Sequence, residues 1–452
     1  MAGLKRLLPR FSLRTLVVFM LLVTSGMGLW WHWEAWYCAA EIRGEGDRIE
    51  SVHLSPDGER LLTGEGDGVV RLREMPGLRV LETCEGPVER ALSLHFTEHR
   101  PPFATMDVKG VRTLRNAESG EPLIVFFWNP TRPDDFPPDA EAGAGGAGET
   151  HASGDGRPFV VPYALLDLSA DGRLALAEGR DGSARVFEVE GCRTVADIRS
   201  VGRIRHGEFS PDGRRIFTIC EDDPPLDDEI GSRHRVDIWS SATGERIPHL
   251  DMVMGGIVDA AFSSDGRRVL AADYRGTVVV FDAGTGRPLL CFKEPWRGRP
   301  SMGVRLQFAD FSPDGGLIRT AWNFGPSVIR DAATGALLGE LTGDDGCFSP
   351  QEDRVFTWGA ETSDVCVWDA STGGRLGLLR EPGAPVWSVE VSPDAEHMVV
   401  RTDDMHAYLY RRRRPEWWWG VFWLWEFWLT AALAAIFVWS VVRDRRRLAR
   451  TG

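Results

Sequence analysis

Short apolar runs separated by polar turns recur along most of the chain, and the stretch Ala260–Leu290 shows this pattern most regularly. Its apolar runs alternate with turns that contain Ser-Asp-Gly, then Asp and Gly, then Gly-Thr-Gly. Runs rich in Val, Leu and Phe that are bounded by Asp and Gly are typical of β-strands joined by hairpins. The pattern predicts four strands, at Ala260–Phe262, Arg268–Ala272, Thr277–Asp282 and Pro288–Phe292.

A turn motif that begins with serine follows an apolar run at regular intervals. Proline at the second position of such a turn presets φ, and glycine supplies the positive φ that closes it. The spacing of roughly 40–50 residues is that of propeller blades. Copies of the form Ser-x-Asp-Gly begin at Ser55, Ser169, Ser210, Ser263 and Ser312, with aspartates Asp57, Asp171, Asp212, Asp265 and Asp314, and looser copies begin at Thr97, Ser349 and Ser392.

A second motif ends the third apolar run, where an aromatic residue or arginine precedes a turn that closes on Thr-Gly. Its copies begin at Trp239, Phe281, Arg330 and Trp368, and only Trp368-Asp369 is a literal Trp-Asp pair. With these two motifs, residues 36–410 resemble the WD40 repeat family. The resemblance implies an all-β, WD40-like β-propeller of four-stranded blades. The Gly-His dipeptide of the family is missing, so we expect packing to hold the blades together.

Eight first-strand starts predict eight blades, with seven as the alternative. The last blade begins near Val386 and supplies only three strands before the chain reaches an apolar C-terminal segment. Propellers of the family close their ring with an N-terminal strand that completes the last blade, and the resemblance assigns this role to Tyr37–Arg43. Closure protects edge strands that would otherwise pair with other chains.

Two apolar segments flank the repeats and are candidates for transmembrane helices. Leu16–Trp31 follows a basic N-terminus and is either an uncleaved anchor or a cleaved signal peptide, although bulky residues stand where a cleavage site would lie. Trp417–Val442 precedes a basic C-terminus, and its tryptophans crowd one end as in an aromatic belt. These are Trp417, Trp418, Trp419, Trp423 and Trp425, followed by Glu426, which lies either near the interface or within the membrane.

The chain is therefore predicted to have three parts. Residues 1–35 form a basic tail and an anchor, residues 36–410 the propeller, and residues 411–452 an interfacial segment, a second spanning helix and a basic tail. Basic residues flank the outer ends of both apolar segments, so the positive-inside rule places both termini in the cytoplasm and the propeller outside. Arg411–Arg414 break this pattern. In a bacterium the protein would lie in the inner membrane with a periplasmic propeller.

Two insertions interrupt the repeats. Residues 129–158 are rich in Pro, Gly, Ala and acidic residues and are predicted to be disordered. Residues 221–234 form an acidic loop between the second and third strands of the fourth blade. Its side chains are candidate Ca²⁺ ligands, although their spacing matches no EF-hand and a solvated acidic loop is the alternative. The candidates are Asp222, Asp223, Asp227 and Asp228.

Charge and motifs narrow the function classes. Thirteen basic and four acidic residues lie outside residues 36–410, which leaves that region 39 basic against 62 acidic residues and a formal net charge of −23. Such a surface repels phosphate backbones, so no nucleic-acid partner is expected. The sequence contains no Gly-x-Ser-x-Gly, no His-Glu-x-x-His and no phosphate loop, and it implies no cofactor.

Two functions remain on the sequence alone. The first is a membrane-tethered scaffold, not an enzyme, that binds unidentified protein partners on the extracytoplasmic side. The alternative is a quinone-type propeller enzyme or a small-ligand sensor that uses the central channel. Only the fold-level resemblance supports either one, because the repeat motifs contain turn and core residues and no ligand-specific group.

Overall fold

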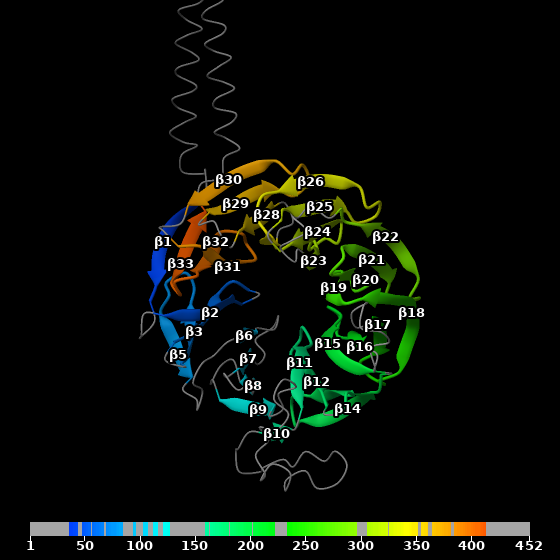
Figure 1. Cartoon of the computed structure of the whole chain (residues 1–452). Helices are drawn as coiled ribbons and strands as arrows, with labels where there is room; N and C mark the ends of the chain where they lie inside the picture. The colour runs from blue at the N-terminus through cyan, green and yellow to red at the C-terminus, as the bar shows by residue number, and fades with distance from the viewer. Residues whose placement is uncertain are drawn as a thin grey trace, which may run out of the picture. The chain divides into compact units, whose positions relative to one another are not determined.

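Eight β-sheets, called blades here, follow one another around a ring (Figure 1). Eight blades, rather than seven, confirm the count of first-strand starts. The computed structural model describes residues 36–43, 48–55, 57–66, 69–84, 94–95, 103–106, 112–115, 121–126, 159–161, 163–179, 181–200, 202–221, 233–295, 305–323, 325–350, 354–359, 364–380 and 384–412.

Apart from β1 (Trp36–Ile42) in the last blade, the strands of each blade are consecutive along the chain, and except for β10 (Phe159–Val161) they form antiparallel hairpins with their neighbours. Blade 1 comprises β2 (Ile49–Leu54), β3 (Arg60–Glu65), β4 (Val70–Glu74) and β5 (Val80–Cys84), and blade 2 comprises β6 (Leu94–His95), β7 (Phe103–Met106), β8 (Arg112–Arg115), β9 (Pro122–Phe126) and β10 (Phe159–Val161). Blade 3 comprises β11 (Ala164–Leu168), β12 (Leu174–Glu178), β13 (Ala184–Glu188) and β14 (Arg193–Ile198). Blade 4 comprises β15 (Arg203–Phe209), β16 (Arg215–Glu221), β17 (Arg233–Ser240) and β18 (Arg246–Gly255).

The remaining blades repeat this order, with the first strand innermost in the ring (Figure 1). Blade 5 comprises β19 (Ile257–Phe262), β20 (Arg268–Asp273), β21 (Thr277–Asp282) and β22 (Pro288–Lys293), and blade 6 comprises β23 (Leu306–Phe311), β24 (Leu317–Trp322), β25 (Ser327–Asp331) and β26 (Leu337–Leu341). Blade 7 comprises β27 (Asp345–Phe348), β28 (Arg354–Trp358), β29 (Asp364–Asp369) and β30 (Arg375–Arg380). Blade 8 comprises β31 (Val386–Val391), β32 (His397–Thr402) and β33 (Ala407–Arg412), and β1 (Trp36–Ile42) completes it.

The closing strand lies where the family resemblance implied. β1 pairs with β33, so the first described strand becomes the fourth strand of the last blade. The seam between blades 8 and 1 is also bridged by a hydrogen bond of 2.6 Å from the backbone N–H of Ile49 to the carbonyl oxygen of Met405. β33 includes Arg411 and Arg412, so the last blade extends two residues past the predicted boundary at 410.

Strand assignment from the sequence is accurate in blade 5. The third strand has its predicted ends, the second and fourth are one residue longer, and the first begins three residues earlier, at Ile257. Blade 2 differs from expectation because β10 adds a fifth strand, parallel to β9, directly after the predicted insertion. The insertion itself and most of the acidic loop lie outside the described residues.

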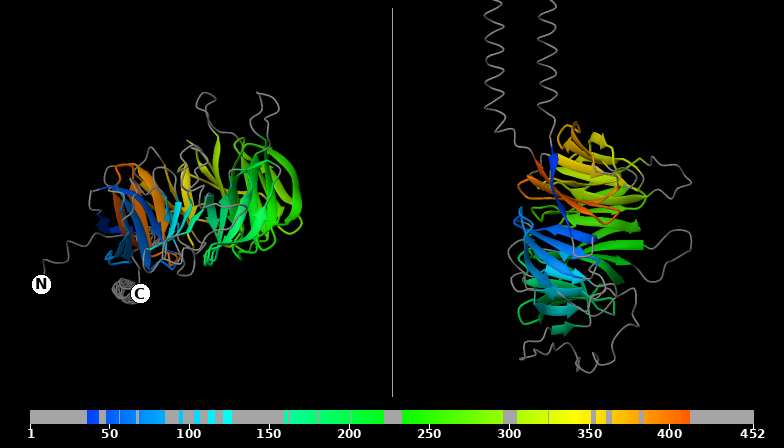
Figure 2. Two further views of the ribbon diagram at one scale, coloured as in Figure 1. Left: turned by 90° about the horizontal axis from the view of Figure 1, so that it is seen from below. Right: turned by 90° about the vertical axis from the view of Figure 1, so that its left-hand side faces the viewer.

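The hydrophobic core lies between neighbouring blades rather than within one sheet. Phe217 and Ile238 of blade 4 pack in one buried cluster with Val269 and Phe281 of blade 5. The sheets stand side by side around the ring (Figure 2), so the second and third strands of each are covered on both faces. This explains why β21 contains a continuous apolar run, whereas β22 on the outside alternates between exposed and partly buried residues.

Among the described residues, no helix is both long and apolar enough to cross a membrane. The two predicted spans, with Trp417, Trp418, Trp419, Trp423 and Glu426, lie outside the part of the chain that the structure describes. Membrane attachment therefore remains a prediction.

The turn glycines provide a test of the repeat. Gly213 has a φ of 67°, a region that costs roughly 1–2 kcal/mol for a residue with a Cβ, and the nearest atom to an added Cβ would be 3.8 Å away. We expect Gly213→Ala to lower the free energy of unfolding by about 1 kcal/mol through the backbone alone, measured by urea denaturation. Gly77→Ala is the control, because its backbone has no such φ and no atom lies within 4 Å. An equal loss in both variants would contradict this origin.

Candidate functional site

The serine turns are closed hydrogen-bonded units. In blade 4, Ser210 Oγ donates to Asp212 Oδ1 at 2.6 Å and accepts the N–H of Arg215 at 2.9 Å, while Asp212 Oδ1 accepts the N–H of Arg214 at 3.1 Å. Burial raises the pKa of Asp212, but the hydrogen bonds from Ser210 and Arg214 and the charges of both arginines outweigh burial and lower it. The same contacts join Ser55 to Asp57, Ser263 to Asp265 and Ser312 to Asp314. These side chains hold the turn.

Two buried tryptophans hydrogen-bond within their blades. Trp239 and Trp368 are 4% and 7% exposed. Their Nε1 atoms donate to Thr218 Oγ1 at 2.8 Å and to Thr357 Oγ1 at 2.7 Å. Each tryptophan therefore links the third strand of its blade to the second, in addition to the packing between blades. Asp369 then accepts hydrogen bonds from the N–H groups of the turn that follows.

Arginine takes the place of tryptophan in other blades and pairs with a buried acid. In blade 6, Arg330 donates from Nε and Nη2 to the carboxylate of Glu294, at 2.5 and 3.0 Å. Glu294 follows β22 and is 1% exposed, so this pair joins blades 5 and 6. In blade 1, Arg73 donates to Glu65 at 2.8 Å. The sequence signal was an arginine at the tryptophan position, but its acidic partner had no fixed spacing.

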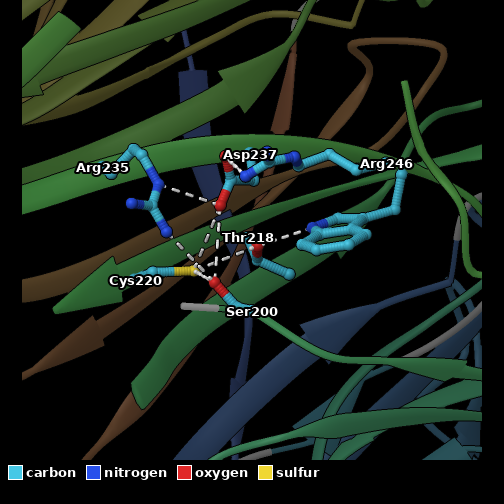
Figure 3. A network of polar contacts seen from close by, with 7 residues as sticks. Ser200, Thr218, Cys220, Arg235, Asp237 and Arg246 are labelled. Atoms are coloured by element: carbon cyan, nitrogen blue, oxygen red, sulfur yellow. Dashed lines mark hydrogen bonds and ion pairs between the residues drawn. The ribbon is translucent and has the colours of Figure 1, made fainter. Parts of the chain in front are cut away.

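Blade 4 contains the most connected buried polar network (Figure 3). Asp237 is fully buried and accepts hydrogen bonds from Arg235 Nε at 3.0 Å and Arg246 Nη1 at 3.4 Å. Ser200, from the connection between blades 3 and 4, donates to Cys220 Sγ at 2.8 Å. Burial raises the pKa of the Cys220 thiol, which keeps it protonated and a poor nucleophile. The network therefore favours a structural role at the junction of the two blades.

A β-bulge recurs at an equivalent position on six of the inner strands. Each bulge lies four residues before the last residue of its strand, or two in β11, and leaves one residue out of register with the second strand. At a bulge two residues face one residue of the partner strand, and the side chain of the bulged residue is re-aimed. We call these residues the bulge ring. They are Glu50, Leu166, Arg205, Val258, Gln307 and Trp387.

Trp387 is the outstanding member of the bulge ring. It is 59% exposed, the highest value among the large hydrophobic side chains of the described residues. The guanidinium of Arg401 lies 5.2 Å from its ring centroid, and Arg401 itself is 9% exposed. A cation stacked on one face of the indole holds the ring in place. Tryptophan and arginine are also the residue types most enriched in interaction hot spots.

The bulge ring was not identified from the sequence. Five of its members precede the serine of their turn by five residues and Leu166 precedes Ser169 by three, but the members have no residue type in common that would mark this position. A further signal was Trp387, a tryptophan within an otherwise apolar run. The predicted metal ligands Asp222, Asp223, Asp227 and Asp228 lie outside the described residues, and the described part contains no group of three or more His, Cys, Asp or Glu residues that could hold a metal ion.

Comparison with known proteins supports the fold. The family model described as "WD domain, G-beta repeat" matches residues 36–73, which run from β1 to β4. The chain is similar to the C-terminal WD40 domain of Sif2 (TM-score 0.59, 13% identity, 84% of this chain and 99% of that one) and to the computationally designed Ika8 protein (TM-score 0.57, 16% identity, 82% and 98%). No curated protein matches the sequence. The fold is that of a WD40 β-propeller, which generally serves as a protein-interaction scaffold.

The buried network of blade 4 predicts that removal of the Asp237 charge strongly lowers the free energy of unfolding. Asp237→Asn keeps the shape of the side chain but removes the buried carboxylate charge that two partly buried arginines face, so we expect a loss of about 3 kcal/mol in the free energy of unfolding. The control is Glu188→Gln, which removes a carboxylate from an exposed pair with Arg193 and should cost less than about 1 kcal/mol. Denaturant titration of both variants measures the difference. Similar losses would refute the assignment of Asp237 as a structural junction.

Proposed function

We propose that the protein is a membrane-tethered interaction scaffold whose propeller binds a protein partner through the bulge ring on the extracytoplasmic side. The observation that carries this proposal is the exposed indole of Trp387 on the inner strand β31, held from one face by Arg401 of β32. A large apolar ring that is rigid before binding loses little conformational entropy on association. The proposal includes no catalytic step.

The recurrence of the β-bulge on six inner strands supports a shared binding surface rather than one isolated contact. The bulges place Glu50 on the neighbouring inner strand of blade 1, and Val258, 36% exposed, on blade 5. The ring therefore combines apolar and charged members on separate rigid strands. Interaction surfaces commonly place apolar anchors within a polar rim. The membrane part of the proposal rests on the apolar segments at the two ends and on their flanking basic residues.

The binding surface is tested by substituting two equally exposed hydrophobic residues. Trp387→Ala should reduce partner recovery from a detergent extract at least tenfold, because a central aromatic anchor contributes 2 kcal/mol or more to binding. Leu289→Ala is the matched control, since Leu289 is 56% exposed on the outer strand β22. A photo-crosslinker at each position, read by mass spectrometry, identifies what is bound there. Equal crosslinking yields at positions 387 and 289, or unchanged recovery with Trp387→Ala, would argue against the bulge ring.

The side of the membrane is tested with an exposed thiol. Cys291 is exposed on β22, whereas Cys192, Cys220 and Cys366 are buried. If the propeller is extracytoplasmic, a membrane-impermeant maleimide should label Cys291 in intact spheroplasts to the same extent as in lysed ones. Cys291→Ser provides the background signal, and peptide mass spectrometry separates this site from Cys38. Labelling only after lysis would place the propeller on the cytoplasmic side.

A further inference from the structure

Two partly buried carboxylates connect the inner strands of neighbouring blades. Asp167 on β11 accepts a hydrogen bond from the backbone N–H of Phe209 on β15, with 2.7 Å between the heavy atoms. Asp259 on β19 accepts one from the N–H of Ala309 on β23, at 3.0 Å. Asp167 directly follows a bulged residue in blade 3, and so does Asp259 in blade 5. Each carboxylate therefore bridges the seam to the next blade next to the bulge ring.

Other titratable groups face these two carboxylates from the strands packed against them. From β15, Glu208 and His206 act on both aspartates, and from β23, Asp310 acts on Asp259. In addition, His206 Nε2 lies 3.5 Å from Glu208 Oε1. The seams from blade 3 to blade 6 thus hold four acidic side chains and one histidine.

One buried cation stands near this acidic series, and it is already engaged. Arg319 on β24 donates from Nε and Nη2 to the two carboxylate oxygens of Asp310, at 3.1 and 3.0 Å. Asp345 and Cys347 of β27 face the same pair from blade 7. Because the guanidinium forms a bidentate pair with Asp310, it does not offset the charge of Asp167 or Asp259 in a comparable way.

Protonation of these groups changes near neutral pH. Burial raises the pKa of Asp167 to about 7 and that of Asp259 to about 6, and the charge of Glu208 adds to both shifts. Burial alone would lower the pKa of His206, but its hydrogen bond to Glu208 and the charges of Glu208, Asp259 and Asp167 outweigh burial and raise it. All three groups therefore gain a proton as the pH falls from about 8 to about 5.

The sign of the effect on stability follows from linkage. An aspartate with a folded-state pKa above its ordinary value of 3.8 binds more protons when folded, so its contribution to stability is complete at low pH and is lost as the pH rises through the folded-state pKa. A histidine with a raised pKa acts in the same direction. At pH 8 Asp167 and Asp259 are largely ionised and lie near the carboxylate of Glu208, whereas at pH 5.5 both aspartates are largely neutral.

We propose that the inner strands of blades 3 to 6 form a proton-dependent latch, in which protonation of Asp167 and Asp259 tightens the seams beside the bulge ring and deprotonation loosens them. Uptake of a proton removes repulsion between neighbouring carboxylates and leaves the backbone hydrogen bonds in place. If the partner binds the bulge ring, which rests on the proposed function, then pH controls the rigidity of half of that surface.

Hydrogen exchange of the purified full-length protein tests the latch without any partner. Exchange at pH 5.5 and pH 8, corrected for the intrinsic rates, gives protection factors for β15 and β23. We expect protection of both strands to be about tenfold or more higher at pH 5.5, relative to β3 of blade 1, since a shift of one pKa unit corresponds to a factor of ten. Equal relative protection at the two pH values would overturn the proposal.

Each seam has its own variant. Asp167→Asn should abolish the pH difference in β15 only, and Asp259→Asn should abolish it in β23 only, because an amide oxygen still accepts the backbone hydrogen bond but does not titrate. The control Asp331→Asn, at an exposed turn outside the seams, should leave both differences unchanged. Persistence of the β15 difference in Asp167→Asn, or its loss in the control, would refute the latch. Because the readout concerns the protein alone, failure to find a partner leaves this result interpretable.

Discussion

The face-to-face stacking of the blades is the constraint on which the structure depends. The second and third strands of each blade are covered on both faces, so every side chain at a seam must fit apolar neighbours or find a polar partner. The repeat meets this demand with Val, Leu and Phe in most positions. Some polar groups are paired across the seam, as Glu294 is with Arg330 and Asp167 with the backbone of Phe209, and others are paired within one blade, as Trp239 is with Thr218. Polar contacts therefore hold the ring together in addition to apolar packing.

The same constraint divides the aspartates into two groups with opposite responses to pH. The turn aspartates, such as Asp212 and Asp265, accept several hydrogen bonds near solvent, and these lower their pKa. Their contribution to stability is lost at low pH. The seam aspartates, Asp167 and Asp259, have a raised pKa because of burial, and their contribution is lost as the pH rises. Together these groups predict a stability maximum near about pH 5.

Much of the fold could be predicted from the sequence because it depends on local signals. Turn motifs at Ser210 and Ser263 mark the ends of strands, and an incomplete last blade indicated that an N-terminal strand closes the ring. Contacts between blades were beyond prediction, since they join residues without fixed spacing. Glu294 lies 36 residues before Arg330, and nothing in either neighbourhood indicates the other. The extra strand β10 was missed for the same reason, because its pairing depends on where a long insertion returns.

The candidate site could not be predicted because it arises from departures within a regular strand. A bulge displaces one residue without changing the local composition, so Glu50, Gln307 and Trp387 share a position but no residue type. Four of these side chains are exposed, namely Arg205, Val258, Gln307 and Trp387, whereas Glu50 and Leu166 are partly buried. The next residue along the strand still faces the neighbouring blade, so its side chain needs a partner there. In blades 3 to 5, each bulge-ring residue is therefore followed on the same strand by a titratable residue at the seam. A change of protonation at the seam thus occurs directly beside the proposed binding surface.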